Sequence, residues 1–121
     1  MIEGAIYRQR DGACLLARVL RTDSAWDRMR GLLGRAPLRA GEGLLIAPCS
    51  SVHTLGMGYP LDLVFLDREG RVRKCVSGLV PRRMAASRGA AMTLELAGGS
   101  LRGLDLRVGE VLEWRSRPWE P

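Results

Sequence analysis

The sequence predicts an α+β fold that is predominantly β: a compact, barrel-like single domain of mostly antiparallel strands with short helices at its rim. Apolar residues occur in short runs of strand length, and turn residues such as Asp11-Gly12 separate them. The chain has 121 residues, of which 46% are hydrophobic, so one domain can bury a core without disulfides or a metal. We therefore expect a single domain over residues 1–121, with a frayed tail over 115–121.

The first half of the chain predicts a hairpin, a short helix and a strand. Asp11-Gly12 is a typical turn, so residues 7–20 are expected to form the hairpin. Ser24 with an aspartate three residues later resembles a capping box. Trp26, Met29, Arg30 and Leu33 then follow helical spacing, and Gly31 and Gly34 should end the helix. Residues 43–48 form a short apolar run that stops at a proline, as a buried strand does.

The second half predicts further strands. Residues 61–67 are almost continuously apolar, which is typical of a central strand, and 71–76 should return as its hairpin partner. Apolar and other residues alternate over 92–97, which predicts a strand with one face in the core. Ser100 is positioned to cap a single helical turn, and residues 106–114 form the last expected strand.

Composition restricts the classes of protein. The N-terminus lacks a basic region followed by an apolar run, so we expect no signal peptide. No stretch approaches the roughly 18 apolar residues of a membrane span. Three cysteines without a C-x-x-C pair predict reduced thiols and a cytoplasmic location.

The net charge of +6 raises the possibility of nucleic-acid binding. Aromatic residues make up only 5% of the chain, and the three tryptophans lie far apart in sequence. The densest basic cluster, Arg82, Arg83 and Arg88, is short and is expected in a loop. A nucleic-acid surface usually gathers its basic residues and adds aromatic side chains that stack on bases, so nucleic-acid binding is only a minor alternative.

The segment from Cys49 to Asp67 is the best candidate site, because it holds the only histidine, a cysteine and a carboxylate beside a rigid strand. Cys49 and His53 are suited to a thiolate nucleophile and its base, with Asp62 as a third member and the backbone around Gly56 and Gly58 as an oxyanion site. In the alternative interpretation Cys49 packs and His53 makes a hydrogen bond in a loop. A single histidine argues against structural zinc, so we expect no metal and no cofactor.

Asp62 lies at the start of an apolar strand. Strand alternation places it on the same side as Val64 and Leu66. Because a buried carboxylate needs partners, we expect it to contact Arg30, His53 or backbone N–H groups of the Thr54–Gly58 loop.

Several blocks of the sequence together resemble a known family. They are Arg30-Gly31-Leu32-Leu33-Gly34-Arg35, Gly43-Leu44-Leu45-Ile46, the run from Pro60 to Asp67, Leu94-Glu95-Leu96-Ala97-Gly98 and Leu106-Arg107-Val108-Gly109-Glu110. In this order they are similar to the bacterial domain-of-unknown-function family 192, from about Arg30 to Val111. Many members carry Trp-Met-Lys-Asn-Thr before the Pro-hydrophobic-Asp block, whereas this chain resembles a branch with His53 in place of that tryptophan.

The resemblance implies a fold rather than an activity, because the family has no established activity. The strand ending in Gly98-Gly99, one helical turn and the Val108-Gly109-Glu110 bend resemble the Gly-Asp boxes of small cradle-type barrels. Many relatives are exported or lipid-anchored, and this sequence is expected to lack that leader.

Two functions from different classes fit the sequence. The first is a non-enzymatic module that binds a small molecule or a protein segment in a cleft near residues 49–62. The residues expected to line that cleft are Arg30, Cys49, His53, Thr54, Met57 and Asp62. The second is a thiol-dependent hydrolase or transferase that uses Cys49 and His53. The first is favoured, because no complete catalytic set is visible.

Overall fold

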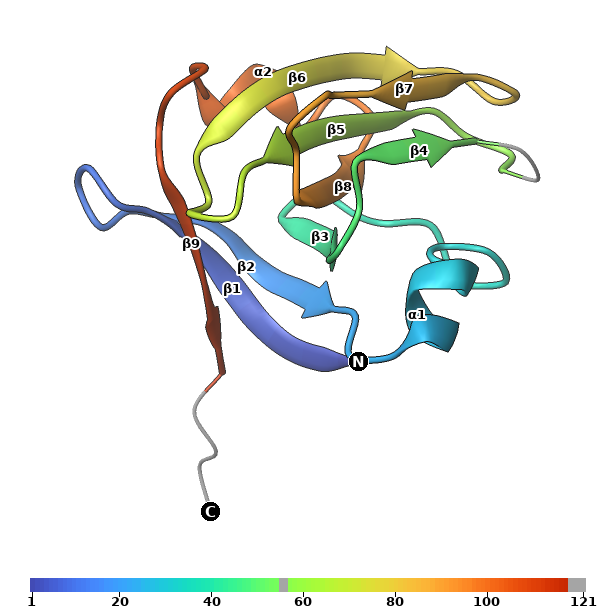
Figure 1. The fold of residues 1–121 in the computed structure, drawn as a ribbon, viewed down its shortest axis with the longest axis horizontal. Coiled ribbons are helices and arrows are strands. Elements are labelled where there is room, and N and C mark those ends of the chain that lie inside the picture. Colours follow the sequence, from blue (N-terminus) through green and yellow to red (C-terminus); the bar gives the residue numbers. More distant parts are fainter. Residues whose placement is uncertain (55–56, 118–121) are drawn as a thin grey trace.

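The structure, a computed structural model, describes residues 1–54 and 57–117 (Figure 1). The elements in these ranges are β1 (Ile2–Arg8), β2 (Cys14–Arg21), α1 (Ala25–Arg30), β3 (Glu42–Ile46), β4 (Ser51–His53), β5 (Leu61–Leu66), β6 (Val72–Leu79), β7 (Met84–Ala86), β8 (Met92–Ala97), α2 (Leu101–Leu104) and β9 (Leu112–Ser116). The prediction of a predominantly β domain with short helices is confirmed.

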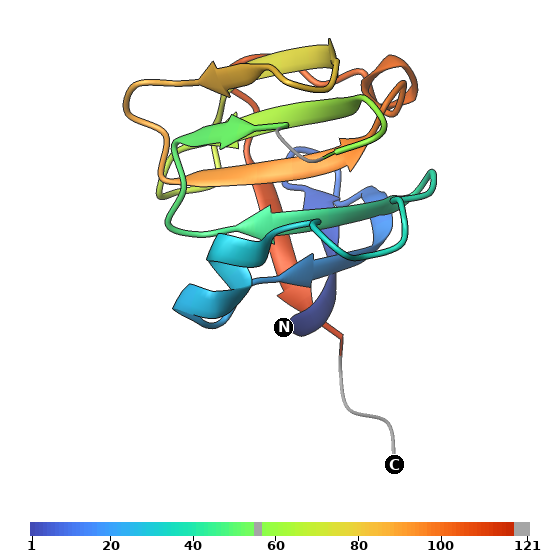
Figure 2. The same ribbon diagram turned by 90° about the vertical axis from the view of Figure 1, so that its right-hand side faces the viewer.

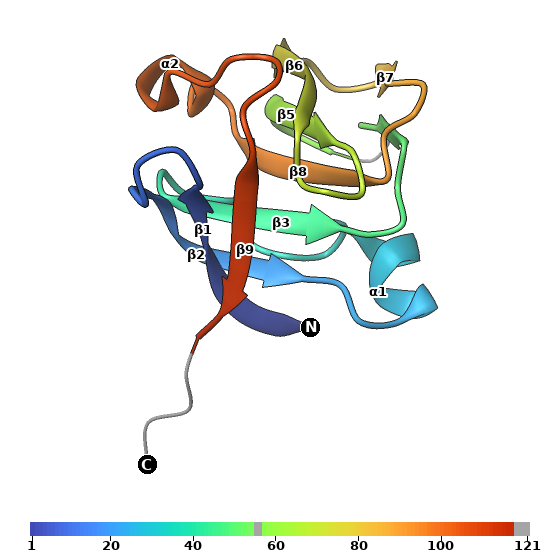
Figure 3. The same cartoon turned by 60° about the vertical axis from the view of Figure 1, so that its left-hand side comes forward.

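Seven strands form one sheet in the order β6-β5-β8-β3-β2-β1-β9, antiparallel except between β2 and β3. The sheet curls, and Figure 3 shows β1 and β9 turned steeply against β3 and β8. The edge strands approach at one end through an isolated bridge between Arg71 and Val111. No ladder joins β6 to β9 along their length in the part of the chain that the structure describes, so the expected barrel is not confirmed.

The sheet separates two hydrophobic cores, because β5 and β8 are covered on both faces. All six residues of β5 are buried. One core lies on the side enclosed by β1, β2 and β9, and consists of Ile6, Leu16, Val19, Leu45, Val64, Leu66, Val72, Leu94, Leu96 and Leu112. The other core lies on the opposite side of the sheet and consists of Leu32, Leu44, Ile46, Val52, Leu61, Leu63 and Phe65.

A second layer covers the second core. It consists of β7, the neighbouring β4 and then α1, which lie in that order in Figures 1 and 2. Val52 of β4 and Leu32 just after α1 supply the apolar contacts with the sheet. This layer was not expected, because the segment around His53 and the cluster of Arg82, Arg83 and Arg88 were both expected in loops, whereas they contain or flank β4 and β7.

The local signals for the hairpin and the first helix are confirmed. Gly12 has φ of +71°, a conformation that favours glycine, in the connection between β1 and β2. The Ser24 side chain accepts a hydrogen bond from the Asp27 N–H at 3.0 Å, as an N-cap does. Gly31 follows the helix with φ of +53°.

Several boundaries differ from the predictions. The last strand, β9, begins at Leu112 and not at residue 106, β6 continues to Leu79, and β1 begins at Ile2. Residues Arg115 and Ser116, assigned to the tail, continue β9 and pair with Ala5 and Gly4 of β1. Residues 118–121 of the predicted tail lie outside the described residues. The Ser100 side chain makes no cap hydrogen bond to α2.

The side chain of Asp62 makes the hydrogen bond at the start of α2 instead. It is completely buried, and its Oδ2 accepts a hydrogen bond from the Leu101 N–H at 2.8 Å. Its Oδ1 accepts another from the Gly78 N–H, also at 2.8 Å. One side chain of β5 therefore links β6 and the start of α2.

The predicted alternation in β5 is confirmed. Val64 and Leu66 belong to the first core, whereas Leu61, Leu63 and Phe65 belong to the second. The prediction that Arg30 or His53 contacts Asp62 is wrong. The donors are backbone N–H groups of residues that the sequence places far away, and Leu55 and Gly56 of the expected loop lie outside the described residues.

We expect Asp62→Ala to lower the free energy of unfolding by about 3 kcal/mol, because it removes two hydrogen bonds to a charged group and leaves two N–H groups without an acceptor. Urea unfolding monitored by tryptophan fluorescence measures the change. Glu69→Ala, at an exposed turn, is the control and should change stability by less than about 0.5 kcal/mol. A loss below about 1 kcal/mol for Asp62→Ala would contradict the assigned role.

Candidate functional site

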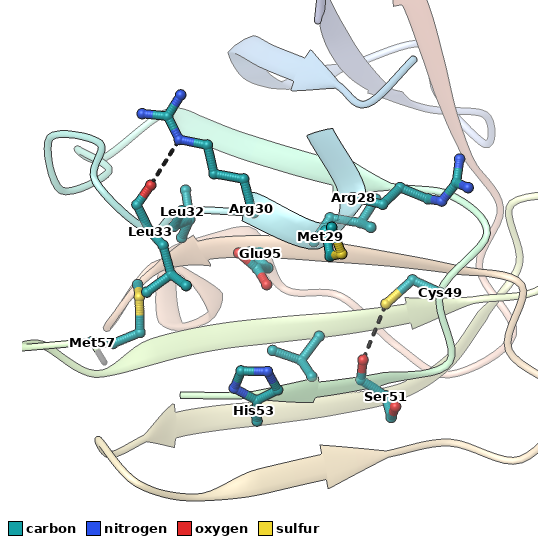
Figure 4. A pocket seen from close by; sticks show the side chains of 13 residues that line it. Arg28, Met29, Arg30, Leu32, Leu33, Cys49, Ser51, His53, Met57 and Glu95 are labelled. Carbon is teal, nitrogen blue, oxygen red and sulfur yellow. Dashed lines mark hydrogen bonds between the residues drawn. The ribbon is translucent and has the colours of Figure 1, made fainter. Parts of the chain in front are cut away.

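A cleft separates α1 from β4 in the second layer, and strand β8 of the large sheet forms its floor (Figure 4). Its volume is about 100 Å³. One wall is α1 with the turn that follows it, and the other is β4 with the residues before it. The lining residues are Arg28, Met29, Arg30, Gly31, Leu32, Leu33, Ile46, Cys49, Ser51, Val52, His53, Met57 and Glu95.

Glu95 is the charged residue at the floor. It lies in the middle of β8, opposite Leu44 of β3 and Leu63 of β5, and only 5% of its surface is exposed. Its Oε2 is buried and has no hydrogen-bond partner among the described residues. Buried polar atoms are almost always paired, so an unpaired carboxyl oxygen at the floor of a cleft is unusual.

Burial determines the protonation of this group. Removal from water disfavours the carboxylate, which raises the pKa of Glu95 to about 7. Burial also raises the pKa of Tyr59, and the neighbouring Glu95 charge adds to that effect. The Tyr59 hydroxyl is likewise buried without a partner among residues 1–54 and 57–117.

Four of the predicted site residues line the cleft: Arg30, Cys49, His53 and Met57. The structure thus brings the Cys49–His53 segment together with the first helix, as the binding hypothesis requires. Asp62 is not among the lining residues, because it faces the first core, on the opposite side of the sheet from Glu95.

Thr54 also does not line the cleft. It is completely buried, its hydroxyl donates to the Val80 carbonyl at 2.7 Å, and the Arg83 N–H donates to that hydroxyl at 2.9 Å. These bonds attach the end of β4 to the start of β7. Thr54 therefore holds the wall of the cleft in place.

Cys49 and His53 occupy the same wall, but no hydrogen bond joins their side chains. The Cys49 thiol donates to the Ser51 carbonyl at 3.1 Å, a bond that uses the protonated sulfur (Figure 4). Gly56, a candidate for an oxyanion site, lies outside the described residues.

Arg30 closes the end of α1. Its Nε donates to the Leu33 carbonyl at 3.0 Å, and Figure 4 shows its guanidinium directed away from Glu95. The guanidinium of Arg28 also points away from Glu95 in that view. Neither arginine, as placed, neutralises the carboxyl group at the floor.

Sequence reasoning missed Glu95 because its strand alternates, and the alternate positions were taken as the face outside the core. In the structure both faces of β8 are buried, and Thr93 on the same face as Glu95 is completely buried. The signal that could have revealed the burial of Glu95 is the position of β8 between the apolar strands β5 and β3. That position is known only once the order of strands in the sheet is known.

No group of three or more His, Cys, Asp or Glu side chains within residues 1–54 and 57–117 is arranged to hold a metal ion. None of the helices that the structure describes is long and apolar enough to cross a membrane.

Comparison with known proteins places the chain in a family and among solved folds. Residues 6–114 match the family DUF192, described as "Uncharacterized ACR". A protein of unknown function from Novosphingobium aromaticivorans is 22% identical, with a TM-score of 0.72 over 93% of this chain and 84% of that one. A protein from Sinorhizobium meliloti, described as a "putative transcription regulator", is 23% identical, with a TM-score of 0.77 over 93% of this chain and 92% of that chain. At these identities the likeness shows the fold alone. Curated proteins gave no significant match.

The raised pKa of Glu95 predicts a stability that falls as the pH rises. Between the unfolded pKa of about 4.5 and the folded pKa of about 7, the folded chain binds more protons than the unfolded chain. The stabilisation that Glu95 contributes is fully present below pH 4.5 and is lost as the pH rises through about 7. At ~1.4 kcal/mol per pKa unit, the free energy of unfolding changes by about 3 kcal/mol. The test variant keeps the other titratable residues near Glu95, which are Arg28, Arg30, Cys49, His53 and Tyr59, and it removes the charge that adds to the raised pKa of Tyr59.

Glu95→Gln should therefore be more stable than the wild type by about 2–3 kcal/mol at pH 8.5 and nearly equal to it at pH 5. Urea unfolding at both values measures the difference. Glu69→Gln, at an exposed turn, is the control, and its free energy of unfolding should change with pH as that of the wild type does. Parallel curves for Glu95→Gln as well would show that this carboxyl titrates normally.

Proposed function

This chain belongs to the DUF192 family, and on its fold and cleft we propose that it is a non-enzymatic binding module that holds a small molecule or a protein segment between α1 and β4. The family match carries no activity, so the proposal rests on the chemistry of the cleft. The cleft combines one buried carboxyl group, one histidine, one thiol and two arginines with apolar side chains.

The unpaired Oε2 of Glu95 is the observation that supports this proposal most directly. A buried polar group without a partner costs about 1–3 kcal/mol, and a folded chain gains nothing structural from this one. A ligand that hydrogen-bonds to the carboxyl group would recover that energy on binding. Apolar walls with few convergent polar groups are typical of binding pockets.

We expect amine, amide and alcohol fragments, screened by ¹⁵N-¹H NMR, to shift the amide signals of Ser51, His53 and Glu95. Glu95→Gln should weaken binding of the amine hits at least ten-fold, because it removes a charge-assisted hydrogen bond. Glu69→Gln should bind like the wild type. A screen whose hits all shift residues outside the cleft would refute the proposal.

The second candidate is a thiol-dependent hydrolase or transferase. The observation in its favour is that Cys49 and His53 line the same cleft as Glu95. It requires the thiol to leave the Ser51 carbonyl and reach a His53 nitrogen, since the thiolate is the nucleophile.

Iodoacetamide labelling of Cys49 as a function of pH separates the two candidates. For the binding module we expect the pH dependence of labelling to be the same in His53→Ala as in the wild type. Labelling that is fast at neutral pH in the wild type and slow in His53→Ala would instead favour the thiol enzyme. Cys14→Ser and Cys75→Ser confine the labelling to Cys49.

A further inference from the structure

The free edge of β4 borders the cleft. In the antiparallel pair of β4 and β7, the Thr54 N–H donates to Arg83 at 2.8 Å and the Ser87 N–H donates to Ser50 at 3.0 Å. Hydrogen-bonded and non-hydrogen-bonded pairs alternate in such a ladder. The backbone N–H and C=O groups of Val52 therefore point toward β7. The backbone N–H and C=O groups of Ser51 and His53 therefore point away from β7.

The backbone groups on that side face the cleft. Figure 4 shows the Ser51 carbonyl directed into it, where it accepts the Cys49 thiol. The opposite wall of the cleft is α1, and no strand lies between α1 and β4 among the described residues. A strand edge that pairs with no other strand is a template for an added strand, which here would replace the Cys49 thiol at the Ser51 carbonyl.

Large apolar side chains are exposed on the elements of the second layer, and one of them, Met29, lines the cleft. Trp26 and Met29 lie three residues apart on α1 and are 66% and 74% exposed. Met84 of β7, which pairs in register with His53, is 72% exposed. Exposed methionine and aromatic side chains on neighbouring elements are typical of surfaces that bind peptides, and a ligand confined to the small cavity would not cover them.

The floor of the cleft adds a charge requirement. Glu95 is buried there with an unpaired oxygen, and the guanidinium groups of Arg28 and Arg30 point away from it. A basic side chain is the complementary group, because an ammonium or guanidinium brings both the charge and several hydrogen-bond donors.

We propose that the partner is an extended peptide segment that pairs with the free edge of β4, in the gap between β4 and α1, and places a lysine or arginine side chain on Glu95. This inference rests on the proposed binding function and names its ligand class. The peptide becomes the third strand of the β7-β4 sheet. Its outward-facing side chains contact the exposed Trp26, Met29 and Met84.

A positional-scanning library of N-acetylated, C-amidated hexapeptides tests the inference. We expect enrichment of lysine or arginine at one position with apolar residues two positions away, since alternate residues of a strand share a face. For the best hexapeptide, Glu95→Gln should raise the dissociation constant at least ten-fold, as should norleucine in place of the basic residue. Glu69→Gln should leave the constant unchanged.

The strand pairing has its own test. N-methylation of the hexapeptide at alternate residues should abolish binding in one register and have little effect in the other, because only one set of N–H groups faces β4. Ser51→Pro, which removes an N–H that the β4–β7 ladder does not use, should weaken binding at least ten-fold. N-methylated peptides give the answer even if that variant fails to fold.

The outcomes separate the two proposals. Binding without a basic preference, or equal binding by Glu95→Gln, overturns the peptide inference. So does the absence of hexapeptide binding when fragments bind at Glu95, a result that leaves the proposed function intact. If neither hexapeptides nor fragments bind in the cleft, both proposals are wrong.

Discussion

Burial of β5 and β8 on both faces is the constraint on which the rest of the structure depends. A strand covered on both sides has no position at which a polar side chain can reach bulk water, so each one needs an internal partner. These strands carry two buried carboxyl groups, Asp62 and Glu95. The sheet places them on opposite faces, and their surroundings give them different roles.

Asp62 is satisfied and Glu95 is not. Two backbone N–H groups donate to Asp62, so its carboxyl group contributes to the fold by joining β5 to β6 and to α2. Glu95 faces the second layer, where β4 and α1 leave a gap above it and its Oε2 lacks a partner. The same physical rule therefore assigns a structural role to the first carboxyl group and supports a binding role for the second.

The second layer explains why the gap exists. It consists of a two-stranded ladder and a helix of six residues, which together are too small to cover the sheet. Thr54 anchors the ladder to the chain around Val80 and Arg83, and Arg30 closes the end of the helix. Each wall is thus held by its own hydrogen bonds, and the space between the walls is the cleft above Glu95.

Local signals in the sequence determined the hairpin turn at Gly12, the helix cap at Ser24 and the alternation of β5, because each depends on residues close in the chain. They also indicated that Cys49, His53, Met57 and Arg30 share a site, which the lining of the cleft is consistent with. Only the tertiary structure determined the partners of Asp62 and the burial of Glu95. Leu101 and Gly78 reach Asp62 across the fold, and a second layer covers a face of β8 that alternation alone left outside the core. Neither fact is encoded in the spacing of neighbouring residues, since both depend on which strands become neighbours in the sheet.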